Sequence, residues 1–173
     1  PELNLKEIHD DAIDAHSGIN MHYSIKSTTG PANLLTAVSI DGRTIPINLI
    51  QSSTIPHGYS VVFIFSSDLF GAIADSSRQK LLLPDGLSES LLYAIFRREI
   101  GHILSEHIPQ INETNTKAQQ KFEAQFPHLL GYFDSSTVGL IDREDALNEA
   151  QQKFFRIQKE ILQCESLSDE IYE

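Results

Sequence analysis

Two hydrophobic periods divide the chain, and the first of them predicts β-strands in its N-terminal part. Alternation of apolar and polar residues predicts a strand over 21–27. Two β-branched runs, 34–40 and 44–50, flank an Asp-Gly pair at positions 41 and 42, and such a pair between two strands indicates a hairpin. The near-continuous apolar run 59–65 predicts a central strand that is buried on both faces.

Proline and glycine positions refine this picture of the sheet. Pro46 lies inside the second arm of the hairpin and has no backbone N–H to donate, so this arm is predicted to be an edge strand or to contain a bulge. After the last strand, the pattern predicts a short helix over 68–74 and a turn over 81–86. These two segments lead into the most apolar helix-length run of the chain.

The second period, with apolar residues three and four positions apart, predicts helices. Four segments have this spacing: 4–15, 91–108, 113–126 and 142–173. Asn4 is a candidate N-cap for the first, with Glu7 three residues later. Ser88 is a candidate N-cap for the second, which Pro109 is expected to end.

Composition limits the classes of function. The chain of 173 residues has a net charge of −11 and no basic cluster, so nucleic acid and anionic membranes are not expected as partners. No apolar run reaches about 18 residues, as a membrane span requires, and no signal peptide is recognisable. The single cysteine, Cys164, cannot form an internal disulfide and suits a reducing compartment, so we expect a cytoplasmic protein.

The helix predicted over 91–108 carries an unusual set of charged residues. At about 100° per residue, Arg98, Glu99, His102 and Glu106 project into one sector of this helix. Apolar residues occupy the opposite side, and two more lie within the polar sector. Burying ionisable groups is costly without a partner or a task. The pattern therefore predicts a buried helix with a polar cluster that faces something specific.

The run Arg98-Glu99-Ile100-Gly101-His102 resembles the HExxH signature of zinc metallopeptidases, the zincins. The resemblance implies that Glu99 is the general base and that His102 is the second zinc ligand. Arg98 stands where the first ligand should be. A guanidinium group has no lone pair and remains protonated, so it cannot bind zinc. Zinc is thus the cofactor that the family implies, and Arg98 makes binding by this chain doubtful.

The order of the elements resembles the gluzincin branch of that family. In that branch the third zinc ligand is a Glu on a later helix, and Glu170 and Glu173 are the leading candidates, with Glu165 and Asp169 as further ones. The metzincin branch is disfavoured, because Ser105 and Ile108 occupy the positions of its Gly and third His. The resemblance implies an α+β fold, in which a small mixed or antiparallel sheet packs on a buried zincin-type active-site helix and a long C-terminal helix follows.

Other readings of the same residues remain open. Arg98, Glu99, His102 and Glu106 could form an ordinary ion-paired helix face with no catalytic role. A di-iron bundle would need a second E-x-x-H copy, which the chain lacks. Cys164 lies in an amphipathic helix, which favours a packed and inert thiol over a nucleophile.

These inferences lead to one functional expectation and an alternative. We expect a single zincin-like domain over 1–173, made of a helix and sheet over 1–66, a motif helix over 88–108 and a helical part over 113–173, truncated at the C-terminus. Its expected activity is hydrolysis of a peptide or protein substrate through a metal-activated water, impaired by Arg98. The alternative is an inactive pseudo-peptidase that acts as a protein-binding or regulatory module. The sequence does not determine the oligomeric state.

Overall fold

The computed structural model describes residues 2–14, 16, 18–74 and 79–172; within these, the side chains of 72–74, 79–80 and 165–172 are not described. Two compact units are distinguished, Pro1–Ile111 and Asn112–Glu173, and each is described by itself. Among the described residues, no helix combines the length and the apolar character that crossing a membrane requires.

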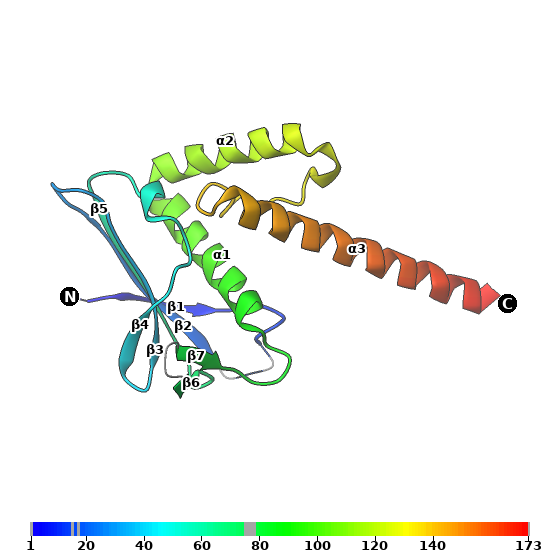
Figure 1. Ribbon diagram of the computed structural model, residues 1–173, viewed down its shortest axis with the longest axis horizontal. Helices are drawn as coiled ribbons and strands as arrows, with labels where there is room; N and C mark the ends of the chain where they lie inside the picture. Colours follow the sequence, from blue (N-terminus) through cyan, green and yellow to red (C-terminus); the bar gives the residue numbers. More distant parts are fainter. Residues whose placement is uncertain (1, 15, 17, 75–78, 173) are drawn as a thin grey trace. The chain divides into compact units, whose positions relative to one another are not determined.

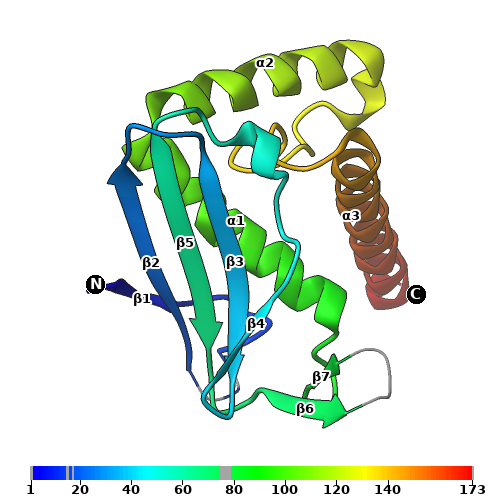
Figure 2. The same ribbon diagram turned by 60° about the vertical axis from the view of Figure 1, so that its left-hand side comes forward.

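Unit 1 is built on a five-stranded sheet (Figure 2). Its strands run in the spatial order β1-β2-β5-β3-β4, and all neighbours are antiparallel except the pair β3 and β5, which is parallel. With the long helix of unit 2, this mixed sheet confirms the predicted α+β class. The strands are β1 (Asn4–Ile8), β2 (Ile19–Ser27), β3 (Asn33–Ile40), β4 (Arg43–Pro46) and β5 (Tyr59–Ser66).

The predicted hairpin joins β3 to β4. Asp41 and Gly42 have φ angles of 50° and 76°, as a tight two-residue turn requires. The prediction of an edge strand is also confirmed, because β4 is the last strand of the sheet. This strand ends at Pro46, earlier than the predicted run 44–50, and just beyond it the Ile47 N–H still donates a hydrogen bond to the Thr36 carbonyl of β3 at 2.9 Å.

The predicted helix over 4–15 is wrong, because the chain forms β1 there. Strand β1 pairs antiparallel with β2, with Lys6 opposite Met21 and Ile8 opposite Ile19. Its alternation of exposed and buried side chains places Ile8 in the core. A turn around Asp10 follows the strand, in which the Asp10 carboxylate accepts a hydrogen bond from the Ala12 N–H. Pairing with β2 satisfies the backbone N–H and C=O groups of this segment, whereas an isolated helix of this length would be only marginally stable in water.

Strand β5 is the central strand, as predicted, but only one of its faces is fully buried. Phe63 and Phe65 have no exposed surface and lie on the face that helix α1 covers, whereas Val62 and Ile64 on the other face are half-buried. Figure 2 shows α1 behind the sheet, and no α-helix of the described part of unit 1 covers the opposite face. A continuous apolar run therefore did not mean burial on both faces here.

Helix α1 (Glu89–His107) packs on the sheet and carries the motif residues (Figure 1). It begins as predicted, with the Ser88 hydroxyl accepting a hydrogen bond from the Leu91 N–H at 3.2 Å. The Phe96 ring stacks on Phe65 with 3.8 Å between ring centroids, and this contact anchors the helix to β5. Its C-terminus precedes Pro109, as expected.

The segment between β5 and α1 differs from the prediction. Strands β6 (Gly71–Ala74) and β7 (Gln79–Leu82) pair antiparallel in a separate two-stranded sheet, so the short helix expected over 68–74 is wrong. The turn expected over 81–86 is confined to its last residues, where Gly86 has a φ of 88°. Pairing between two short extended segments outweighs the local helical tendency.

Unit 2 is helical and contains the long helix that the sequence predicts. Its elements are α2 (Pro109–Gln125, which begins at the end of unit 1), the 3-10 turn η2 (Pro127–Leu129) and α3 (Arg143–Tyr172). Helix α2 begins earlier than the predicted residue 113 because Pro109 can occupy the first turn of a helix. The core of the unit comprises Leu129, Phe133, Val138, Ile141, Ala146 and Ala150.

Candidate functional site

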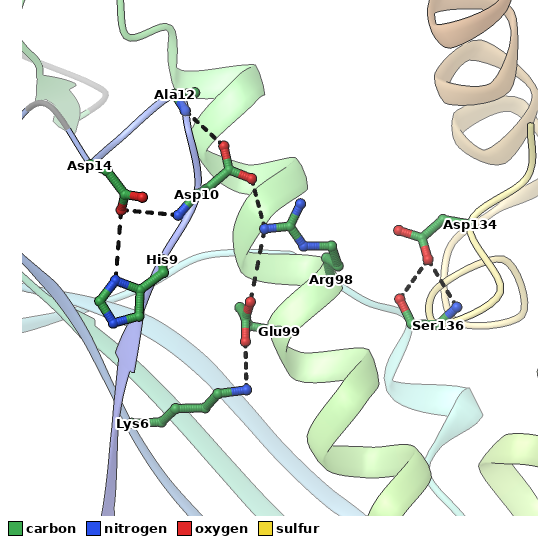
Figure 3. A network of polar contacts seen from close by, with 9 residues as sticks. All are labelled: Lys6, His9, Asp10, Ala12, Asp14, Arg98, Glu99, Asp134 and Ser136. Atoms are coloured by element: carbon green, nitrogen blue, oxygen red, sulfur yellow. Dashed lines mark hydrogen bonds and ion pairs between the residues drawn. The ribbon is translucent and has the colours of Figure 1, made fainter.

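The motif glutamate is buried against the first strand of the sheet. The Glu99 side chain is 10% exposed, and its Oε2 lies 2.8 Å from Nζ of Lys6 on β1 (Figure 3). This oxygen receives no hydrogen bond of acceptable geometry from the described residues, so the contact with Lys6 is an ion pair held by charge. The carboxylate that was expected to act as a general base is therefore neutralised by a cation of the same chain.

Arg98, at the position of the first zinc ligand, turns toward the loop that follows β1. Its terminal nitrogen donates a hydrogen bond to Oδ2 of Asp10 at 2.8 Å and lies 3.9 Å from Oε1 of Glu99. Lys6, Asp10, Arg98 and Glu99 thus form a chain of alternating charges between β1 and α1, which we call the β1–α1 ion cluster (Figure 3). Its two cations and two carboxylates balance.

The ion pairs of the β1–α1 ion cluster contribute only moderately to the stability of unit 1. The Lys6 and Arg98 side chains are 40% and 34% exposed, and at such positions ion pairs contribute little and salt screens them. Glu99 is the exception, since a buried carboxylate needs compensation by opposite charge. The arrangement therefore explains why the chain tolerates a buried glutamate on a helix that packs against the core.

The remaining predicted site residues do not join this cluster. The side chains of His102 and Glu106 on α1 are both exposed, whereas that of Glu99 is buried. The polar sector predicted from the helical wheel therefore has a buried part at Glu99 and a solvent-exposed part at His102 and Glu106. Glu170 lies on α3, but its side chain is outside the described residues, as is the whole of Glu173. The third ligand therefore stays a prediction.

The donor set of the described residues does not fit zinc. Within the described ranges, no three His, Cys, Asp or Glu side chains lie together as a metal site requires. At the motif itself, Arg98 contributes a positive charge and Glu99 faces Lys6, so two cations stand where a metal ion would be held. The described residues at the motif therefore do not form a zinc site.

Two members of the ion cluster, Lys6 and Asp10, were not foreseen from the sequence. Both fall in the segment 4–15 that the sequence predicts to be a helix, so their contacts with α1 could not be inferred from that prediction. No local signal revealed Lys6, because Leu5 and Ile8 are spaced three residues apart, as on a helix, and only the pairing with β2 makes this segment a strand.

A cavity lies at the carboxyl ends of the parallel strands β3 and β5. It is a polar cavity of about 430 Å³, lined by Gly18, Asn20, Ser39, Asp41, Gly42, Ser66, Ser67, Asp68 and Phe70. One lining hydroxyl, that of Ser66, lies 3.1 Å from Nε2 of His22. The strand registers place Asn20, Ser39 and Ser66 on the face of the sheet that is opposite Lys6, so this cavity is separate from the ion cluster.

No family model, no curated protein and no solved structure matches the chain. The resemblance to zincins therefore depends on the residues of the motif and on the order of the elements alone.

Proposed function

We propose that this chain is an inactive, peptidase-like protein-binding module, in which the β1–α1 ion cluster takes the place of a metal centre. The observation that supports the proposal most directly is the pair of contacts that Arg98 and Glu99 make with Asp10 and Lys6, each at 2.8 Å. A guanidinium supplies positive charge where a zincin would hold a metal ion, and it needs no ligands because it is covalently part of the chain and stays protonated.

The binding surface that we propose is the free edge of β1. Strand β1 pairs with β2 on one side only, and no other described strand pairs with its second edge. An exposed strand edge can pair with an extended segment of another protein through backbone hydrogen bonds, with side-chain contacts supplying specificity. Leu3 and Leu5 are exposed here and offer apolar contacts to such a segment.

Metal-dependent hydrolysis of a peptide or protein is the second candidate function, and one substitution separates the two. In Arg98→His, the motif becomes complete and we expect the chain to gain about one zinc ion, as measured by elemental analysis after purification with metal. The unaltered chain is expected to carry none. Gain of proteolysis by Arg98→His would show that the scaffold supports peptidase chemistry.

The control for this experiment is the double variant Arg98→His with Glu99→Gln. It should retain zinc and lose any new proteolysis, because the amide cannot act as a general base. A stoichiometric zinc content in the unaltered chain would contradict the proposal of a metal-free module. Absence of zinc in Arg98→His would contradict the zincin-like scaffold and leave an ordinary ion-paired helix face.

The β1 edge is tested by selection of extended peptides from a random peptide library on the immobilised full chain. Leu5→Lys should weaken binding of the selected peptides by about tenfold, which corresponds to ~1.4 kcal/mol. The reason is that a lysine at this position removes an apolar contact and adds a charge that natural edge strands use to discourage pairing. Dissociation constants from calorimetry would measure the change.

The matched control is Leu130→Lys, which makes the same substitution in unit 2. The two leucines are almost equally exposed, 64% for Leu5 and 65% for Leu130, so any general effect of the added charge should be shared. Equal affinities for the Leu5→Lys and unaltered chains would argue against the β1 edge, as would a selection that yields no binding peptide.

A further inference from the structure

A row of polar side chains crosses the sheet of unit 1 at the carboxyl ends of β3 and β5 (Figure 2). The strand registers set Asn20 of β2 opposite Ser66 of β5, and Ser66 opposite Ser39 of β3. Residues that lie opposite each other in neighbouring strands point to the same face of a sheet. Earlier along β5 this face carries Val62 and Ile64, so the polar residues gather at one end of the strands.

The polar cavity of about 430 Å³ is lined by this row and by the loops beside it. The loops contribute Gly18 before β2, Asp41 and Gly42 in the β3–β4 turn, and Ser67 and Asp68 after β5, and the buried Phe70 adds an apolar wall. A volume of this size is typical of sites for small molecules. A single metal ion, with oxygen ligands at about 2.0–2.6 Å, would leave most of it empty. The cavity therefore fits a small organic molecule.

Several polar side chains of the cavity have no partner among the described residues. The side chains of Asn20, Ser39, Asp41 and Asp68 take part in no hydrogen bond or ion pair there. Asn20 and Ser39 are half-buried, so water reaches them less freely than it reaches the two exposed carboxylates. Amide and hydroxyl groups both donate and accept hydrogen bonds, as the hydroxyl groups of a ligand do. The floor of the cavity is therefore suited to a molecule with several hydroxyl groups.

The charges around the cavity favour a cationic ligand. Asp41 and Asp68 supply two carboxylates, and Glu7 of β1 extends the polar row on the same face of the sheet. The described lining residues include no lysine, arginine or histidine. Arg43, in the turn beside the cavity, lies opposite Ile40, which is buried on the other face of the sheet. An anionic ligand would be repelled here, whereas an ammonium group would be attracted.

We propose that the polar cavity binds a small polyhydroxylated amine. Its ammonium group lies beside Asp41 and Asp68, and its hydroxyl groups form hydrogen bonds with Asn20, Ser39 and Ser66. An ammonium group only donates hydrogen bonds and a carboxylate only accepts them, so the two groups complement each other. The polar row lies on the face of the sheet opposite Lys6, so this site and the β1–α1 ion cluster can be tested separately.

Three linear six-carbon polyols with different end groups test the proposal at neutral pH. D-Glucamine ends in an ammonium group, D-sorbitol in a neutral hydroxymethyl group and D-gluconate in a carboxylate. In NMR titrations of the full chain, glucamine should bind with a dissociation constant on the order of millimolar, at least about tenfold more tightly than sorbitol. Gluconate should not bind, and added salt should weaken the binding of glucamine. The largest amide shifts should fall at Gly18, Gly42 and Ser67.

The double variant Asp41→Asn with Asp68→Asn removes both charges and preserves the size of the side chains. Residue 41 has a φ of 50°, and an Asn-Gly pair suits this turn as well as Asp-Gly does. The double variant should bind glucamine about tenfold less tightly and no better than sorbitol. The matched control is Asp11→Asn with Asp85→Asn, which removes two exposed charges outside the cavity and should keep both the affinity and the preference for glucamine. Circular dichroism verifies that both variants keep the fold.

Four results would overturn the proposal. They are binding of glucamine no tighter than that of sorbitol or gluconate, amide shifts centred away from the cavity, and equal losses of affinity in the two double variants. The fourth is a titration with magnesium or calcium chloride that gives the same shifts at lower concentrations than glucamine does, because the site would then hold a metal ion.

Discussion

Replacing Phe96 by alanine should lower the free energy of unfolding of unit 1 by about 3–5 kcal/mol. The Phe96 side chain has no exposed surface and lies between the rings of Phe65, Phe70 and Tyr93, with the Phe65 ring stacked at 3.8 Å. Truncation removes the ring contact between α1 and β5 and leaves a cavity in the core. Since domains are stable by only about 5–15 kcal/mol, the loss would be a large fraction of the total.

Urea denaturation followed by circular dichroism measures this change. Phe96→Leu should recover most of the loss, because leucine keeps an apolar side chain of similar volume in the same place. The control Leu130→Ala, at an exposed position, should change the unfolding free energy by less than about 0.5 kcal/mol. A Phe96→Ala variant as stable as Leu130→Ala would show that α1 is not anchored to the sheet at this ring.

The second large effect is expected at Asn115, where Asn115→Asp should destabilise unit 2 by about 3 kcal/mol. Asn115 is 1% exposed and connects α2 to the loop before α3. Its amide nitrogen donates to the Ser136 carbonyl at 3.0 Å, and its oxygen accepts from the Gly139 N–H at 2.7 Å. Aspartate keeps the acceptor but presents a second oxygen to the Ser136 carbonyl, and it buries a charge.

The pH dependence of this variant gives an internal check. Burial beside a carbonyl should raise the pKa of the carboxyl group introduced by Asn115→Asp above its unfolded value. The sign follows from proton binding: the folded state then binds more protons, so stability is highest at acidic pH and falls as the pH rises through the raised pKa. Asn112→Asp on the exposed side of the same helix is the matched control. Equal stability of both variants near neutral pH would contradict the role assigned to Asn115.

Features determined by neighbouring residues could be predicted from the sequence. The Ser88 cap, the Asp41-Gly42 turn and the start of α1 each depend on a few adjacent residues, and the structure confirms all three. The helix prediction for residues 4–15 was wrong because their apolar spacing fits a helix. Their pairing partner, β2, lies later in the chain and supplies the backbone hydrogen bonds that make β1 a strand. The strand–strand contact outweighed local propensity.

In the candidate site, too, local features could be predicted from the sequence and long-range contacts could not. That Glu99 is buried and faces a specific partner could be inferred from its place on an apolar helix, and the structure agrees. That the partner is Lys6 could not be inferred, because a contact spanning most of unit 1 depends on the order of the strands. The parallel pairing of β3 with β5 is equally non-local, and it brings the carboxyl ends of these two strands together at the polar cavity.

The segment from β1 to Asp10 is attached to the rest of unit 1 by backbone pairing and by two ion pairs. Strand β1 is held on one side by the ladder with β2 and on its inner face by Lys6, and Asp10 fastens the end of the segment to Arg98, 88 residues away. Because these two ion pairs are partly exposed to solvent, rising ionic strength weakens both of them. The backbone ladder with β2 does not depend on charge, so we expect β1 to stay paired while the Glu99 carboxylate loses its ionic partners and becomes more accessible to solvent.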